Sequence, residues 1–104
     1  MQIVEEHFED GTFRYDQIER QGMKALYSQT HKTSGIQRYE TVILRVKKAG
    51  IAPGGYDIPE REAYPTSREW GLYGWTFYTL SEARRDYERL VSQTMSLEEQ
   101  GTEL

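Results

Sequence analysis

The chain contains no cysteine, and only 3 of its 104 residues are proline. Without a thiol it can form neither a disulfide framework nor a thiolate zinc site, and it has no cysteine nucleophile. No apolar run approaches the roughly 20 residues that a membrane-spanning helix needs, and the first residues lack the basic and apolar blocks of a signal peptide. These absences predict a soluble cytoplasmic protein that makes no contact with a membrane.

Aromatic residues are plentiful: the chain has 8 tyrosines, 3 phenylalanines and 2 tryptophans, and 37% of it is hydrophobic. That much aromatic surface predicts a folded core rather than a disordered chain. The length suits one core and is too short for two, so we expect a single domain over residues 1–104. Residues 1–10 and 95–104 have little to bury, and we expect both ends to fray.

The net charge of −4 is unevenly distributed along the chain. Residues 12–48 hold eight lysines or arginines against three acids, whereas residues 49–104 hold five arginines against ten acids. The basic stretch favours two interpretations. It binds an anionic partner such as nucleic acid, or the acidic remainder of the chain neutralises it.

Alternating large and polar residues predict strands in the first half of the chain. Residues 12–20 and 23–29 flank Gly22 and predict a tight hairpin. Residues 36–47 are rich in β-branched and aromatic side chains, which indicates a long strand. Strand periodicity places Val42, Leu44 and Val46 on the core face. The other face of the strand then carries Tyr39, Thr41, Ile43, Arg45 and Lys47.

The second half begins with residues 48–73, whose glycines and prolines predict a long loop with a short helical turn capped by Ser67. A short strand over 74–78 follows. Thr79 and Glu82 then have the spacing of a capping box, and an apolar stripe at helical spacing comes after them: Leu80, Ala83, Tyr87, Leu90 and Val91. The predicted fold class is α+β, with a three- to four-stranded antiparallel meander and one C-terminal helix packed on one face.

Residues 64–78 concentrate both tryptophans and three of the eight tyrosines. These rings either form a recognition surface around Tyr64, Trp70, Tyr73 and Trp75, or they complete a small core. Strand parity predicts that Trp75 is buried, and its place in the loop predicts that Trp70 is partly exposed.

The same segment carries a resemblance. Tyr64-Pro65, then Glu69-Trp70-Gly71 and Tyr73-Gly74-Trp75-Thr76-Phe77, and then Leu80 and Ala83, resemble small uncharacterised proteins of bacterial and bacteriophage genomes. The resemblance covers mainly the C-terminal third. It implies no activity and no functional residues.

No catalytic, metal or cofactor motif is present, so we expect no cofactor, and the lack of motifs favours a non-catalytic protein over an enzyme. Asp57, Glu60 and Glu62 surround Arg61, which is typical of a solvated loop rather than of a metal site. His7 and His31 have no ligand partner nearby in the sequence. The glycine-rich run over 50–55 lacks the lysine and hydroxyl residue that end a phosphate-binding loop.

Three functional hypotheses remain. The first is a non-catalytic binding or accessory module that contacts a protein partner, which includes a second copy of the chain, because aromatic residues are plentiful and enzyme motifs are lacking. The second is nucleic-acid binding by the basic stretch 12–48, where Tyr39, Arg45 and Lys47 share a strand face that suits charge and base stacking. The third is a small enzyme that uses the loop 48–73.

Overall fold

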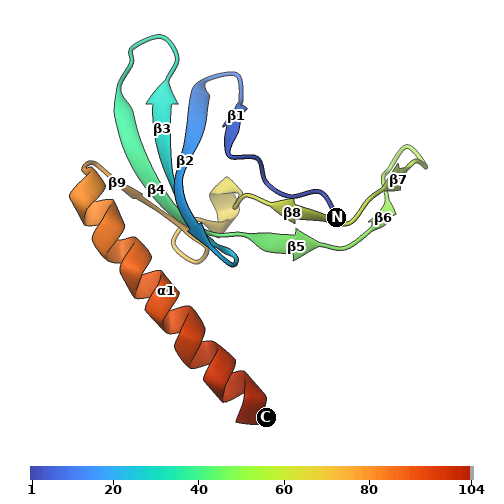
Figure 1. Cartoon of the computed structure of the whole chain (residues 1–104). Helices are drawn as coiled ribbons and strands as arrows, with labels where there is room; N and C mark the ends of the chain where they lie inside the picture. The colour runs from blue at the N-terminus through green and yellow to red at the C-terminus, as the bar shows by residue number, and fades with distance from the viewer. Residues whose placement is uncertain (104) are drawn as a thin grey trace.

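A five-stranded antiparallel sheet with one long helix across it forms the body of the protein (Figure 1). The structure is a computed structural model that describes residues 1–103, with side chains described to residue 93. Within that range the strands lie in the order β1-β2-β3-β4-β9 and the helix is α1. Their bounds are β1 His7–Glu9, β2 Phe13–Gln21, β3 Lys24–His31, β4 Gln37–Ile43, β9 Gly74–Phe77 and α1 Leu80–Glu103. The predicted α+β class with a C-terminal helix is confirmed, and β1 adds a strand to the predicted meander.

The face of the sheet that α1 covers holds one of two core clusters. Leu26 of β3 is fully buried there against the helical residues Ala83 and Tyr87. The predicted apolar stripe of the helix therefore packs on the sheet as expected. At the start of α1, the amide of Glu82 donates to the Thr79 hydroxyl at 3.2 Å, so the predicted cap is confirmed.

The opposite face of the sheet holds the second cluster. Its buried members are Tyr15, Ala25, Tyr27, Val42 and Leu44. Partly buried side chains pack against these residues: Val4, Phe8, Phe13, Met23, Tyr64 and Trp70. Because both faces of the sheet are covered, the aromatic residues contribute to the core on both sides.

A β-bulge in β2 decides which way the end of that strand points. Gln17 lies opposite Tyr27 and Glu19 lies opposite Leu26, so Ile18 is an extra residue in the ladder. An inserted residue reverses the alternation of the side chains that follow it. Glu19 therefore reaches Arg84 on the helix side, whereas the side chain after it points to the opposite face.

The long strand predicted over 36–47 is wrong beyond Ile43. Leu44 turns into the second cluster, and the chain then leaves the sheet. Val46, predicted in the core, is 45% exposed because it lies on a separate two-stranded ribbon. The predicted loop over 48–73 is wrong where short paired strands lie, at 50–51, 57–58 and 61–63, and its predicted helical turn is confirmed at Ser67–Glu69.

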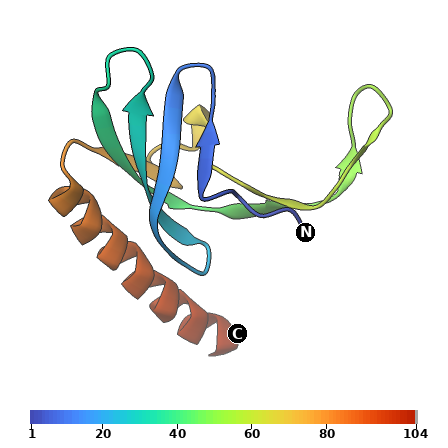
Figure 2. The ribbon, with the colours of Figure 1, turned by 45° about the horizontal axis from the view of Figure 1, so that its top comes forward.

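We call residues 45–63 the arm. β5 Arg45–Lys47 pairs with β8 Arg61–Ala63, and farther out β6 Gly50–Ile51 pairs with β7 Asp57–Ile58. Figures 1 and 2 show the arm projecting from the sheet, with its tip far from the turn between β3 and β4. The Cα radius of gyration is 15.3 Å, above the roughly 13 Å of a compact domain of this length. The chain therefore extends part of its length away from the body.

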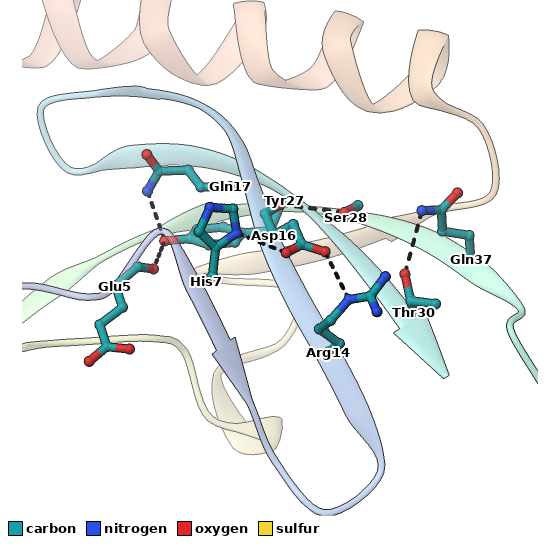
Figure 3. A network of polar contacts seen from close by, with 9 residues as sticks. All are labelled: Glu5, His7, Arg14, Asp16, Gln17, Tyr27, Ser28, Thr30 and Gln37. Carbon is teal, nitrogen blue, oxygen red and sulfur yellow. Dashed lines mark hydrogen bonds and ion pairs between the residues drawn. The ribbon is translucent and has the colours of Figure 1, made fainter. Parts of the chain in front are cut away.

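The expectation that residues 1–10 fray does not hold for the strand within them. β1 pairs with β2, and the Tyr27 hydroxyl donates to the Glu5 carbonyl oxygen at 2.9 Å while it accepts from Gln17 (Figure 3). Phe8 stacks on Tyr15 with a ring-centroid distance of 4.7 Å. These contacts order the segment because they satisfy a buried hydroxyl and bury an aromatic ring. The predicted fraying of 95–104 concerns side chains that lie outside the described residues.

Between the arm and β9, a short 3-10 helix, η1, spans Ser67–Glu69. Its capping residue is Thr66 rather than Ser67, because the Glu69 carboxylate accepts from the Thr66 amide at 3.0 Å. The turn brings Trp70 back onto the second cluster.

Candidate functional site

The arm presents apolar side chains to solvent. Ile51 is 75% exposed and Tyr56 is 67% exposed, and both lie near its tip. At its root, Val46 is exposed as well. Large apolar side chains that gather in an exposed patch are a common mark of an interaction surface.

The root of the arm is held firmly to the body. The Arg20 guanidinium, directed to this face by the bulge in β2, donates to both carboxylate oxygens of Glu62 in β8, at 2.8 and 2.6 Å. The Val4 amide donates to the same carboxylate at 3.0 Å. The guanidinium holds the pKa of Glu62 below its ordinary value. Glu62, predicted to be a solvated loop acid beside Arg61, is therefore an almost buried anchor paired with Arg20.

Two hollows lie on the face of the sheet opposite α1. The smaller, which we call the Phe13 hollow, has a volume of about 240 Å³. It is lined by Phe13, Gln29, His31, Ser34, Ile36 and Arg38. The larger, which we call the Glu40 hollow, has a volume of about 640 Å³. It is lined by Asp10, Tyr15, Gln29, Glu40, Tyr64, Pro65, Ser67, Trp70 and Thr76.

Glu40 is a buried carboxylate, 5% exposed, in the middle of β4. The Tyr64 hydroxyl donates to its Oε1 at 2.7 Å, and the Thr76 hydroxyl bonds to the same carboxylate. Burial raises the pKa of Glu40, and the nearby negative charge of Asp10 adds to that rise. Burial also raises the pKa of Tyr64 well above its ordinary value, so this phenol remains a hydrogen-bond donor.

Asp10 lies at the exposed rim of the Glu40 hollow. Its carboxylate accepts from the backbone amides of Thr12 and Phe13 at 2.7 and 2.6 Å. The amide of Phe13 contributes most to holding the pKa of Asp10 below its ordinary value. The two acids are thus in opposite environments: one is exposed and hydrogen-bonded as the anion, and the other is buried.

The predicted nucleic-acid residues do not form one surface. Tyr39 packs in the cluster beneath α1, whereas Arg45 and Lys47 lie on β5 in the arm. Arg45 pairs with Glu69, and its guanidinium lies 4.2 Å from the ring centroid of Tyr73. The basic side chains therefore lack the neighbouring stacking ring that this hypothesis assigned to them, and the hypothesis stays a prediction.

The predicted aromatic residues separate into two places. Tyr64 and Trp70 meet in the Glu40 hollow, where the Trp70 indole donates to Thr76 at 3.0 Å. Tyr73 instead lies under Arg45. Trp75, predicted to be buried, is half-buried because it faces α1 at the sheet edge, with Arg89 5.3 Å from its ring centroid.

Sequence reasoning missed Glu40, Asp10 and Tyr15 as lining residues. The parity of the strand carried a signal for Glu40, because it lies two residues before Val42 and so shares the face assigned to the core. An acid at such a position needs either partners or a function. Asp10 could not be found this way, since it lies in a turn.

No metal site is apparent, since no group of three or more acidic or histidine side chains gathers among the described residues. In the same range, no helix has the length and apolar character needed to span a bilayer. Comparisons with protein-family models, curated proteins and solved structures found no match to the chain. The resemblance to small bacterial and bacteriophage proteins stays a prediction.

The burial of Glu40 predicts how stability depends on pH. Its native pKa lies above the ordinary 4.5, so the folded state holds a proton that the unfolded chain has already released. The contribution of Glu40 to stability is therefore fully present below pH 4.5 and is lost as the pH rises through the native pKa. Glu40→Gln removes this loss and keeps an oxygen that accepts from Tyr64.

We expect the free energy of unfolding of Glu40→Gln, relative to the parent, to increase from about pH 4 to about pH 8. Urea denaturation at a series of pH values measures it. Glu60→Gln, at an exposed position of the arm, is the matched control. A difference for Glu40→Gln that is independent of pH would contradict the raised pKa.

Proposed function

We propose that the chain is a non-catalytic binding module that acts through a protein–protein contact, and that the arm makes this contact with a second copy of the chain. The observation that carries the proposal is the exposure of Ile51 and Tyr56, 75% and 67%, at the tip of a projecting hairpin. Burying side chains of this size contributes about 1.5–3 kcal/mol each.

The arm has little internal support. Its outer part consists of a ladder of two residue pairs, Gly50 with Ile58 and Ile51 with Asp57. An isolated two-stranded hairpin is marginal in water unless another layer covers it. A partner surface would provide that layer, and the firm anchor between Arg20 and Glu62 holds the arm in position to receive it.

The chain itself offers a matching surface. The Phe13 hollow has an apolar wall formed by Phe13 and Ile36, and Ile36 is 55% exposed. Arg38 at its edge is opposite in charge to Asp57 beside the arm tip. Within one molecule the arm points away from the β3–β4 turn next to this hollow (Figure 2). An arm that fills this hollow therefore belongs to a second molecule, and a two-fold axis would let both arms bind at once.

Sedimentation velocity over a series of concentrations tests this proposal. We expect the parent to associate reversibly, and we expect the double variant Ile51→Ser, Tyr56→Ser to remain monomeric with unchanged circular dichroism. Leu72→Ser is the matched control, because Leu72 is 69% exposed but lies outside the arm. If the parent is monomeric throughout, or if only Leu72→Ser abolishes association, the arm is not the contact.

A further inference from the structure

The Glu40 hollow has an unusual balance of charge. Its lining includes two carboxylates, Glu40 and Asp10, and no lysine, arginine or histidine. None of the ion pairs between described residues involves Glu40. The hollow therefore repels phosphates and carboxylates and attracts cations.

The partners of Glu40 provide hydrogen bonds but no opposite charge. Tyr64 and Thr76 are neutral hydroxyl donors, and Thr76 is itself held by the indole of Trp70. A buried carboxylate that has hydrogen bonds but no counter-ion remains costly to ionise. A cation entering the hollow would supply the missing charge, and it would bind more strongly there than at the protein surface.

The atoms of the lining select the kind of cation. Free acceptor positions belong to the carboxylates of Glu40 and Asp10 and to the side-chain oxygen of Gln29, whose amide nitrogen donates to Tyr15. A primary ammonium group has three N–H donors for such oxygens, and its alkyl chain can lie against the ring of Trp70. A volume of about 640 Å³ is in the range of small-molecule sites.

We propose that the Glu40 hollow binds a primary alkylammonium group, either as a free amine or as the end of a lysine side chain. Glu40 provides the charge at its floor, Asp10 provides a second carboxylate at its rim, and Trp70 provides an aromatic wall. The site shares no residue with the arm, and of the residues that line it Gln29 also lines the Phe13 hollow.

Titration with n-butylammonium, followed by amide chemical shifts in ¹H–¹⁵N spectra, tests the proposal. We expect saturable shifts at residues around the hollow, and much weaker shifts with 1-butanol or butyrate, which have similar size but lack the positive charge. A blocked Gly-Lys-Gly peptide distinguishes the two sources. Binding of the peptide and of the amine indicates a lysine side chain, and binding of the amine alone indicates a free amine. Equal binding of butanol, or no saturation with either ammonium probe, would overturn the site.

Glu40→Gln keeps the shape of the hollow and removes the charge at its floor. We expect affinity for n-butylammonium to fall about tenfold or more, with the fold retained in the same spectra. Asp10→Asn should weaken binding less, since Asp10 is exposed, and Glu60→Gln should leave binding unchanged. Wild-type affinity in a folded Glu40→Gln variant would contradict the proposal.

A pH series gives an independent check. The titratable groups facing Glu40 are Asp10 from the β1–β2 turn, Tyr15 from β2 and Tyr64 after β8, and both phenols stay neutral because their pKa values are raised. The affinity for n-butylammonium should therefore increase with pH as Glu40 ionises and then level off. Affinity that is the same at low and neutral pH would show that Glu40 is not involved.

Discussion

Replacing Leu90 by alanine is expected to lower the free energy of unfolding by about 2–5 kcal/mol, the range for truncating a fully buried leucine. Leu90 is 1% exposed, and it follows Ala83 and Tyr87 at helical spacing on the face of α1 that packs on the sheet. Truncation removes apolar contact and leaves a cavity where α1 crosses β3. Urea denaturation monitored by circular dichroism measures the change.

The control for this variant is Ser92→Ala, an exposed position two residues farther along the same helix. It should change stability by less than about 0.5 kcal/mol. If Leu90→Ala were no less stable than Ser92→Ala, α1 would not be packed on the sheet in solution as the structure has it.

Trp70→Ala is expected to cost about 3 kcal/mol, more than Trp75→Ala. Trp70 packs on the second core cluster, and its ring lies so close to Gly74 that an added Cβ there would come within 2.5 Å of Cζ3. Its indole also donates to Thr76. Trp75 is half-buried at the sheet edge, where Arg89 covers its ring.

This expectation reverses the order that the sequence indicated for the two tryptophans. Thermal and urea denaturation of both variants and of the parent show which tryptophan contributes more to stability. A larger loss for Trp75→Ala would mean that the segment from Tyr64 to Trp70 is held less tightly than the structure shows. It would also weaken the case for an ordered Glu40 hollow.

Local patterns predicted much of the fold. The helix was recognisable because Leu80, Ala83, Tyr87 and Leu90 recur at helical spacing after a cap, and these residues reach the sheet. The hairpin of β2 and β3 was recognisable because strand periodicity ends at Gly22, whose φ of +57° suits the turn.

The sequence did not reveal features that depend on distant contacts. The bulge at Ile18 sends Arg20 to the face where it meets Glu62, 42 residues away, and no periodicity signals that insertion. The end of β4 was missed for the same reason. Side chains typical of strands continue through Lys47, but from Arg45 on the chain pairs with β8 instead of β3. The part of the predicted loop up to residue 63 belongs to a hairpin whose short strands lack an alternating pattern.

The residues of the candidate sites could likewise be predicted only in part. Tyr64 and Trp70 were identified from composition alone, and they do line a hollow. The acids that give this hollow its charge were not identified, because Glu40 and Asp10 are distant in sequence and only the antiparallel sheet brings them together. The exposed arm residues could not be recognised without knowing that residues 45–63 leave the body.

An isotope-filtered NMR experiment on a mixed-label sample detects whether the arm of one molecule binds the Phe13 hollow of another. Equal amounts of ¹³C-labelled and unlabelled protein are mixed at a concentration where sedimentation shows association. We predict intermolecular NOEs that join Ile51 and Tyr56 of one copy to Phe13 and Ile36 of the other. An associated sample in which the arm gives no intermolecular NOE would contradict binding of the arm to the Phe13 hollow.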